Sequence, residues 1–374
     1  MIARMTQSVT DVQLSRINTY VDDPILIAHG TKPERDMLYA IVLSMWTALG
    51  LPLSLEKAVR GETVTWTSAI FTLGPQHIIV EVKQAIVDDA KELVAKALEK
   101  NIFAVKCLRS LTGKLTHIAS LVMTLRPFLS ELYAAQYAER GTAPVGCVWT
   151  KQIITSLEWV RAFLAEIPGK LQRRYDLKTY LSSSLQVSLE LDASPWGLGG
   201  VLLINGRPTS WFASAISTEE LLILDIKLGD SAAQQTVEAL AALVAMRAWH
   251  GWWSPTRSTV RVRSDSVSAL ILALKLKTSG RAPGIIAREM ALDMAAALYV
   301  PNIAEHVPGI HNVVPDALSR KYQPGQSFVL PNVLKEVPEL ILPPRGREYY
   351  RGTRAPPPFT TSSRKDRAAL FGER

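Results

Sequence analysis

Cysteine is almost absent from this sequence, with Cys107 and Cys147 the only two among 374 residues. Two cysteines give no disulfide framework, which excludes the disulfide-rich secreted class. The N-terminal residues lack the apolar core of a signal peptide, so we expect an intracellular protein, either cytoplasmic or nuclear. Zinc-ligand spacing is also absent around four of the six histidines, namely His29, His77, His117 and His250.

One long hydrophobic run raises the question of a membrane span. Residues 37–55 carry no charge over 19 residues, which is long enough to cross a bilayer as a helix. Gly50 and Pro52 interrupt the run, however, and leave about 13 helical residues before the break. We therefore predict a buried helix and no membrane partner.

The chain is large and apolar enough for one to three domains, with 48% hydrophobic residues among 374. Its formal net charge of +8 suits a polyanionic partner, but residues 345–374 alone hold eight Lys or Arg against three Asp or Glu. Three successive prolines follow at 356–358, so we predict a basic, Pro-rich disordered tail over residues 321–374. Such a tail either adds nonspecific phosphate affinity or serves solubility only.

The most informative stretch is residues 187–204, VSLELDASPWGLGGVLLI. Its first residues alternate apolar and polar side chains, the period of a half-buried strand, and Asp192 comes where that alternation ends. A second apolar run stops at Asn205-Gly206, the dipeptide that favours a tight hairpin, and TSWFA follows. The sequence therefore predicts a strand hairpin that presents an aspartate on its first strand.

Three further acids follow on predicted regular elements. Glu238 lies in the second turn of a helix predicted over residues 231–249, on a face of small alanines that suits packing on a sheet. Asp265 comes just past a predicted strand, and Asp316 follows the last predicted strand within PDALSR. The order is strand with Asp, hairpin, helix with Glu, strand with Asp, helices, strand and a final Asp.

These four acids, in this order and on these elements, resemble the four-carboxylate site of ribonuclease H. The phrase HVPGIHNVVPDALSR also resembles the end of the ribonuclease H domain in the reverse transcriptases of retroelements. The resemblance covers residues 185–320 and implies a ribonuclease H-like mixed-sheet domain. It implies two Mg²⁺ ions, with Mn²⁺ as the alternative, and an RNA–DNA hybrid as the nucleic-acid partner.

Two metal ions explain why carboxylates are needed. The ions clamp the attacking and leaving oxygens of a phosphodiester, and Mg²⁺ prefers carboxylate and water oxygens over cysteine sulfur. The resemblance makes Asp192 the bridging metal ligand, Glu238 and Asp265 flanking ligands, and Asp316 a more loosely held fourth ligand. The alternative for each acid is an ion pair or a helix cap.

A histidine and three basic residues are further candidates for contact with the substrate. His311 is the candidate for a histidine that assists product release or proton transfer, because His306 falls on the last predicted strand; the alternative is a structural histidine. Lys275, Lys277 and Arg281 lie in a basic loop after the third acid and are candidate phosphate contacts, or else a solvated polar loop.

An N-terminal motif points to a second activity. Tyr20-Val21-Asp22-Asp23, between two apolar runs, is identical to the YxDD catalytic hairpin of reverse transcriptases and predicts a hairpin with both carboxylates at its tip. Residues 50–58 resemble the segment that follows this hairpin, and residues 63–82 resemble primer-grip strands. Helical stretches over residues 83–135 resemble the thumb.

The resemblance to a polymerase has one serious departure. Polymerisation also needs a carboxylate from a neighbouring palm strand, which lies well upstream in the family. Here Asp11 is the sole acid before Tyr20, and Pro24 removes a strand N–H directly after the acids. We expect a chain that starts within the palm, in which Tyr20, Asp22 and Asp23 are a polymerase-type remnant that does not polymerise DNA.

We therefore predict an α/β (α+β) protein of five parts: a partial palm (1–82), thumb-like helices (83–140), a connector (141–184), a ribonuclease H-like domain (185–320) and the tail (321–374). The implied function is that of a reverse transcriptase fragment from a retroelement Pol polyprotein, truncated within the palm, that cleaves RNA in RNA–DNA hybrids. The parent protein would be an RNA-directed DNA polymerase. The alternative is a non-catalytic relic that at most binds nucleic acid, and the oligomeric state is left open.

Overall fold

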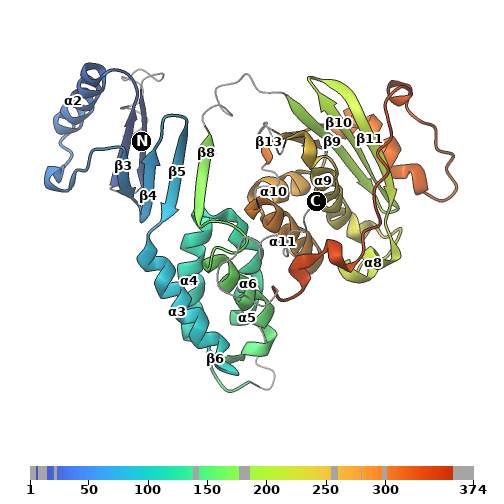
Figure 1. The fold of residues 1–374 in the computed structure, drawn as a ribbon, viewed down its shortest axis with the longest axis horizontal. Helices are drawn as coiled ribbons and strands as arrows, with labels where there is room; N and C mark the ends of the chain where they lie inside the picture. The colour runs from blue at the N-terminus through green and yellow to red at the C-terminus, as the bar shows by residue number, and fades with distance from the viewer. Residues whose placement is uncertain are drawn as a thin grey trace. The chain divides into compact units, whose positions relative to one another are not determined.

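The computed structural model describes residues 6, 15–20, 23–137, 143–176, 186–253, 260–278, 280–296 and 301–356. Helices and strands alternate in it, which confirms the predicted α/β class with mixed sheets. The chain forms two compact units, Met1–Lys83 and Gln84–Arg374 (Figure 1). The predicted thumb-like, connector and ribonuclease H-like parts therefore all belong to one unit. Among the described residues, no helix has the length and apolar character needed to cross a bilayer.

The first unit contains the predicted N-terminal hairpin. Strand β1 (Ser15–Tyr20) pairs antiparallel with β2 (Asp23–Ala28), and Tyr20 lies opposite Asp23 at the closed end. The two form a sheet of their own, so each is an edge strand and Pro24, opposite Thr19, is tolerated. Residues 21 and 22, and with them one of the two predicted carboxylates, lie outside the described residues.

Helix α2 (Lys32–Ala48) overturns the prediction of a buried helix. It begins earlier than the hydrophobic run, because Thr31 caps it: the Thr31 backbone N–H donates to Glu34 Oε2 at 2.7 Å. Its buried side chains are Leu38, Val42 and Trp46 on one stripe, whereas Met37 is 62% exposed. The uncharged run thus supplies one buried face and one exposed face, a distinction that composition alone does not make. After α2 and η1 (Leu55–Lys57), the unit ends in an antiparallel meander of β3 (Thr63–Trp66), β4 (Ala69–Leu73) and β5 (His77–Val82).

The second unit begins with helices packed on an aromatic core. Phe128 lies 5.5 Å from Trp159 and 5.2 Å from Phe163, measured between ring centroids, and all three side chains are buried. The two segments that carry these rings are more than 25 residues apart in sequence, so their packing joins the thumb-like helices to the connector. The elements are α3 (Gln84–Leu98), β6 (Ile102–Ala104), α4 (Val105–Leu121), η2 (Met123–Phe128), α5 (Ser130–Tyr137), β7 (Cys147–Trp149), η3 (Thr150–Gln152), α6 (Ile154–Leu164) and β8 (Gln172–Asp176).

A five-stranded mixed sheet follows in the same unit, in the order β11-β10-β9-β12-β13 (Figure 1). Strands β9, β10 and β11 form an antiparallel meander, and β12 and β13 then add in parallel to β9. Asn205 and Gly206 both have positive φ, 51° and 78°, as the predicted tight hairpin requires. The strands are β9 (Val187–Ser194), β10 (Gly197–Ile204), β11 (Arg207–Ala215), β12 (Val260–Ser264) and β13 (Pro301–His306).

Helices pack on this sheet and bring the acids to it. The alanine face of α9 contacts β9, as predicted for the helix that carries Glu238. Helix α12 lies against β9 and β10, and Gly199 permits this because a Cβ there would lie 2.4 Å from the Pro315 carbonyl oxygen. The helices are α8 (Thr218–Leu224), α9 (Gln234–Ala248), α10 (Val267–Lys275), α11 (Arg281–Ala295) and α12 (Val313–Ser319), with 3₁₀ turns that include η4 (Ser231–Ala233), η5 (His250–Trp252) and η6 (Gly309–His311).

Residues 321–356, which we call the C-terminal strap, correct the predicted disordered tail. The strap pairs at Glu339 with Trp211 of β11, and its Leu334 and Tyr350 side chains are fully buried. Figure 1 shows it running beside β11 and returning toward α11. The prediction of disorder is wrong for this segment because its apolar side chains extend the core, whereas residues 357–374 lie outside the described residues. Short 3₁₀ turns punctuate it: η7 (Arg320–Tyr322), η8 (Asn332–Leu334), η9 (Arg347–Tyr349) and η10 (Arg351–Thr353).

Candidate active site

Asp192 is the most buried of the four predicted acids, at 8% exposure near the end of β9. Both of its carboxylate oxygens accept hydrogen bonds from the segment that contains α12. Ser319 Oγ donates to Asp192 Oδ2 at 2.6 Å, and Asn312 Nδ2 donates to Oδ1 at 3.3 Å. Asn312 also donates to the Leu191 carbonyl oxygen at 3.1 Å, so the end of β9 and the start of α12 hold each other.

The electrostatics of Asp192 show that two other predicted acids lie near it. Burial raises the pKa of Asp192 to about 7, and the negative charges of Asp265 and Asp316 add to that rise. The hydrogen bond from Ser319 and the positive charge of Arg320 act in the opposite direction without offsetting it. Three acids from β9, the end of β12 and α12 therefore form one cluster in which negative charge is in excess.

Glu238, the fourth acid, is held beside the same strand ends. Gln234, one turn earlier on α9, donates to Glu238 Oε1 at 3.1 Å and to the carbonyl oxygen of Ala193 at 2.6 Å. Ser266 Oγ donates to the other Glu238 oxygen. Because Ala193 follows Asp192 and Ser266 follows Asp265, these bonds connect Glu238 to the neighbours of both aspartates.

Asp316 lies at the accessible side of the cluster. Its Oδ1 accepts a hydrogen bond from Arg320 Nε at 2.7 Å, and both side chains are more than two-fifths exposed. His311 is exposed in the turn before α12, and the backbone of Gly309 in that turn is near enough to Asp265 that an added Cβ would lie 3.4 Å from its Oδ2. His306 is exposed at the end of β13, so both histidines border the site and the role of His311 stays a prediction.

The donor set fits a hard cation in kind, because it consists of carboxylates and contains no cysteine. Within the described part of the chain, no three His, Cys, Asp or Glu side chains lie together in an arrangement that would hold an ion as they stand. Instead Ser319, Ser266 and Arg320 each bond one of the acids. Carboxylates repel one another unless a cation lies between them. A site for two Mg²⁺ or Mn²⁺ ions therefore stays a prediction.

Four polar side chains of the site were not singled out from the sequence. Each lies one to four residues from a predicted acid, or just before α12, and each donates to a carboxylate of the cluster: Gln234, Ser266, Asn312 and Ser319. The sequence signal for these residues is a polar side chain three or four positions from an acid on the same helix, as in Gln234 and Glu238 or Asp316 and Ser319. That spacing alone does not reveal that Ser319 bonds Asp192, a residue on another element.

The structure describes only part of the polymerase-type motif. Asp23 is exposed at the closed end of the β1–β2 hairpin, and its carbonyl oxygen accepts a hydrogen bond from Trp66 Nε1 at 2.9 Å. Asp22 lies outside the described residues, and Tyr20 contributes its backbone to β1. The structure therefore supports the hairpin, and the polymerase reading of its acids stays a prediction.

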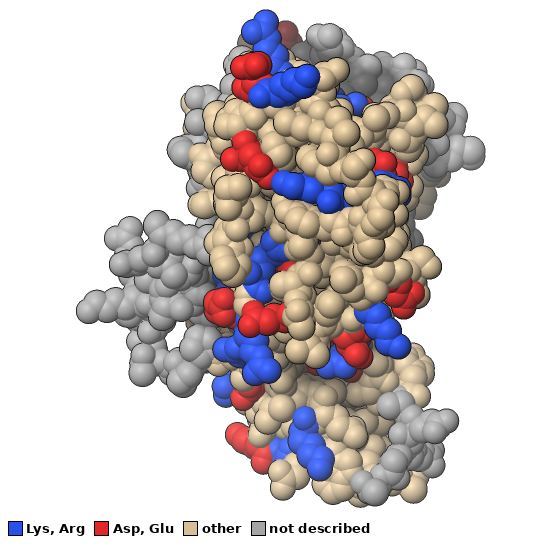
Figure 2. Space-filling view, turned by 90° about the vertical axis from the view of Figure 1, so that its right-hand side faces the viewer, with Lys and Arg blue, Asp and Glu red and all other residues tan. Residues whose placement is uncertain are grey.

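The predicted phosphate contacts lie on the surface. Lys275, Lys277 and Arg281 are exposed around the end of α10 and the start of α11. Arg281 makes a long ion pair of 3.9 Å with Asp225, and both side chains are more than four-fifths exposed, so the pair contributes little stability. Elsewhere, over the face drawn in Figure 2, basic and acidic side chains lie next to one another.

No protein-family model matches the chain, and no curated protein matches it. Among solved structures, it is similar to a foamy viral protease–reverse transcriptase in complex with an RNA/DNA hybrid, with 14% identity and a TM-score of 0.38, over 91% of this chain and 40% of that one. For a foamy viral protease–reverse transcriptase dRH in complex with double-stranded DNA, the identity is 18% and the TM-score 0.34, over 78% and 45% of the two chains. A third, the foamy viral protease–reverse transcriptase with double-stranded DNA, has 16% identity and a TM-score of 0.35, over 82% of this chain and 58% of that one. The chain thus spans between 40% and 58% of the length of these solved structures.

Proposed function

We propose that the chain is a retroelement-derived reverse transcriptase fragment whose mixed-sheet domain hydrolyses RNA within RNA–DNA hybrids. The observation that carries the proposal is the environment of Asp192. Burial raises the pKa of Asp192 to about 7, and the negative charges of Asp265 and Asp316 add to that rise, so the ionised carboxylate is costly for the fold unless a cation or a proton joins it. A carboxyl with a perturbed pKa is a common feature of functional sites, and Asp192 is also one of the four acids that the sequence motif singled out.

When bound, two divalent ions would supply an activated water and would stabilise the charge on the leaving oxygen. Asp192, Glu238, Asp265 and Asp316 would hold them. The residues of the chain contribute orientation: Ser319 and Asn312 fix both oxygens of Asp192, while Gln234 and Ser266 fix those of Glu238. On the exposed side, Asp316 would be the more loosely held fourth ligand, and His311 would assist product release or proton transfer.

An RNA–DNA hybrid is the proposed substrate because the motif around Asp316 resembles the ribonuclease H end of reverse transcriptases. A hybrid is recognised through its phosphates and the 2′-hydroxyls of the RNA strand in a wide minor groove. We do not propose DNA polymerisation by this chain.

A second candidate function is a relic that binds nucleic acid without cutting it. One observation favours it: within the described residues, the acids do not already form a three-ligand metal site. The retention of all four acids, each with a hydrogen-bonding or electrostatic partner in one cluster, favours the catalytic reading.

The test uses the whole chain and an end-labelled RNA–DNA hybrid, with Mg²⁺ and then with Mn²⁺. We expect cutting of the RNA strand only, reduced at least about 10³-fold by Asp192→Asn, because bound metal supplies several kcal/mol of transition-state stabilisation. The matched control is Asp225→Asn, an exposed acid with φ of 54°, a backbone conformation that asparagine accepts. A folded wild-type chain that leaves the hybrid intact with both metals would establish the relic instead.

A further inference from the structure

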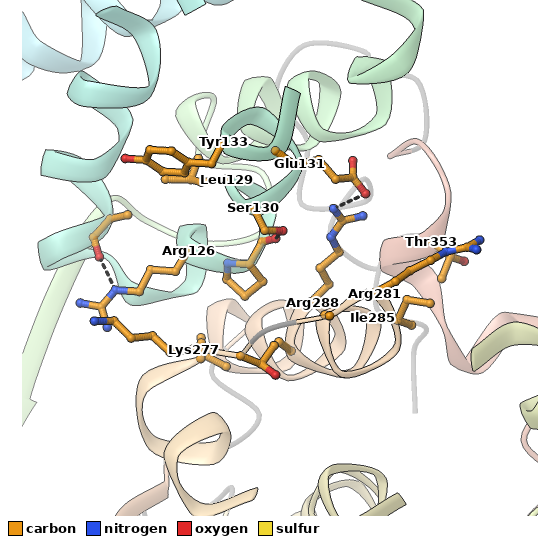
Figure 3. A pocket seen from close by; sticks show the side chains of 18 of the residues that line it. Arg126, Leu129, Ser130, Glu131, Tyr133, Lys277, Arg281, Ile285, Arg288 and Thr353 are labelled. Atoms are coloured by element: carbon orange, nitrogen blue, oxygen red, sulfur yellow. Dashed lines mark hydrogen bonds and ion pairs between the residues drawn. The ribbon is translucent and has the colours of Figure 1, made fainter. Parts of the chain in front are cut away.

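A groove of 1680 Å³ lies in the second unit, away from the four acids. Its walls come from the thumb-like helices α4, η2 and α5 on one side and from α8, the α10–α11 loop and α11 on the other, with residues of the strap at one end. Figure 3 shows Arg126 and Lys277 at one side of it and Arg281 and Thr353 at the other. The volume exceeds the roughly 300–1,000 Å³ of small-molecule pockets, so the groove suits a segment of a polymer.

The charge of the groove is predominantly positive. Arg288 is neutralised by Glu131 at 2.6 Å, and Arg281 makes only the long, exposed pair with Asp225. For the other lining cations, the described residues provide no ion pair: Arg126, Lys277, Arg347 and Arg354. Glu219 is the one further acid of the lining. A polyanion would therefore meet several cations that lack a counter-charge.

The guanidinium of Arg126 is one of these cations, and hydrogen bonds hold it in position. It donates to carbonyl oxygens only: Nε to Ala119 at 3.0 Å, Nη1 to Lys275 at 3.1 Å and Nη2 to Ser120 at 3.4 Å. Burial lowers the pKa of Arg126, and the positive charge of Arg173 lowers it further. A positive charge is thus held in place by neutral carbonyl oxygens, and an anionic ligand would supply it with a counter-charge.

Apolar side chains also line the groove. Leu276 is buried, Ile223 and Ile285 are half-buried, and Leu222 is 77% exposed on α8. Cations and apolar side chains in one groove suit a ligand that carries both anionic groups and flat apolar groups. Single-stranded nucleic acid has this form, whereas a duplex keeps its bases inside.

Helix α10 connects the groove to the acid cluster. Asp265 and Ser266 directly precede the helix, and Lys275, whose carbonyl oxygen Arg126 binds, ends it. Nine residues of helix span about 13 Å, or roughly four base steps of 3.4 Å. A strand that leaves the cluster along α10 would reach the groove within that distance.

We propose that this groove binds single-stranded nucleic acid, with phosphates on the Arg126, Lys277 and Arg347 side chains and bases on the Leu222 and Ile285 side. The choice of nucleic acid among polyanions rests on the proposed function, since the same chain would release or receive unpaired strands next to its cutting site. The groove is then a second nucleic-acid contact, separate from the carboxylates.

The test measures fluorescence anisotropy of a labelled single-stranded oligonucleotide of about 12 nucleotides. The protein is the whole chain with Asp192→Asn and no divalent metal, so that binding is separated from cutting. The double variant Lys277→Glu, Arg347→Glu reverses two exposed groove cations, and Arg207→Glu, Lys335→Glu reverses two exposed cations elsewhere with the same change in net charge. We expect about 10-fold weaker binding for the groove variant only, with a salt-dependence slope smaller by about 1.4.

Two further measurements identify the ligand class. Leu222→Ser should weaken oligonucleotide binding several-fold without changing the salt slope, because it removes apolar contact and no charge. Polyglutamate of the same charge should not displace the oligonucleotide; if it does so equally well, the groove is a site for an acidic protein and the inference is overturned. Equal weakening by both charge reversals would overturn it as well. A chain that cuts hybrids but fails these tests refutes the groove alone, and a chain that passes them without cutting refutes the proposed nuclease alone.

Discussion

Two groups of buried acids in the same unit have opposite electrostatic environments. In the candidate active-site cluster, Asp192 has two carboxylates and two neutral donors around it, and the positive charge of Arg320 only partly offsets the negative charge. In the second group, under the C-terminal strap, Glu220 is fully buried and bonds Arg345, with Arg345 Nε to Glu220 Oε1 at 2.6 Å. The first group has excess negative charge, and the second is neutralised.

The neutralised group is extensive. Arg247 donates to Asp293 at 2.6 Å and to Glu289 at 2.6 Å, and Arg351 of the strap binds the same two acids. Burial alone would lower the pKa of Arg345, but its hydrogen bond to Glu220 and the charge of Glu220 raise it above its usual range. These acids are thus paired with arginines that lie up to 125 residues away in the chain.

The contrast distinguishes acids that stabilise the fold from the acids of the candidate site. A buried carboxylate with a bidentate arginine has its charge and its lone pairs satisfied within the protein. Among the described residues, Asp192 has no such bidentate arginine, and Arg320 pairs with its exposed neighbour Asp316. Negative charge therefore stays in excess around Asp192, which is the physical reason for treating its surroundings as a candidate site.

The largest stability change is expected for Glu220→Gln. The substitution leaves Arg345 buried without its carboxylate, and breaking one partner of a buried pair costs about 3–5 kcal/mol. Urea denaturation measures the loss. Glu219→Gln, at the exposed neighbouring position, is the matched control and should change stability by less than about 0.5 kcal/mol. Similar effects at both positions would show that the strap does not depend on this pair.

In the metal-free chain, ionisation of Asp192 should lower the free energy of unfolding, because within the part of the chain that the structure describes this carboxylate has no bidentate arginine of the kind that Glu220 has. The pKa of Asp192 is about 7 in the folded chain against 3.8 for the ordinary group, so between about pH 4 and 7 the folded state keeps a proton that the unfolded state releases. Stability therefore falls as pH rises through this window, by on the order of 3 kcal/mol, and levels off above it.

The measurement is the difference in unfolding free energy between the wild type and Asp192→Asn at pH 4 and at pH 7. Because carboxylates outside the cluster titrate equally in both chains, the difference isolates the contribution of Asp192 and of its coupling to Asp265 and Asp316. The variant should gain relative stability toward pH 7. A difference that is the same at both pH values would mean that Asp192 is ionised throughout.

Ser319→Ala tests whether the neutral donors orient the site. Loss of the 2.6 Å bond to Asp192 should weaken Mg²⁺ binding by about 10- to 100-fold, the usual effect of removing a group that orients a metal ligand. Titration calorimetry measures this without reference to cutting. Ser214→Ala, which removes a hydroxyl that bonds Arg345 in the neutralised group, should leave Mg²⁺ affinity unchanged. Unchanged affinity in both variants would assign Ser319 a purely structural role.

The smallest effect is expected for Arg320→Ala. Arg320 and Asp316 are both substantially exposed, so the pair contributes less than about 1 kcal/mol to stability. Removing this cation should nevertheless raise the pKa of Asp192, because Arg320 lowers it in the wild type. A loss of several kcal/mol on thermal unfolding would instead place Arg320 with the structural arginines.

Much of the fold could be predicted because its strands, turns and helices depend on local sequence patterns. The alternation in β9, the Asn205-Gly206 turn and the alanine face of α9 each depend on residues close together in the chain. The acids could be singled out for the same reason, since each sits at a fixed place on its own element. The exposure of one side of α2 could not be predicted, because composition does not say which partner covers a hydrophobic face.

The sequence by itself determined the mixed α/β class, the order of the elements and the identity of the acids Asp192, Glu238, Asp265 and Asp316. Only the tertiary structure decided that Ser319 orients Asp192, that the strap is ordered through Arg345 and Tyr350, and that cations gather in a groove beside α10. The physical reason is distance along the chain. Hairpins and helices follow from neighbouring residues, whereas whether a buried charge is neutralised depends on a partner more than 100 residues away.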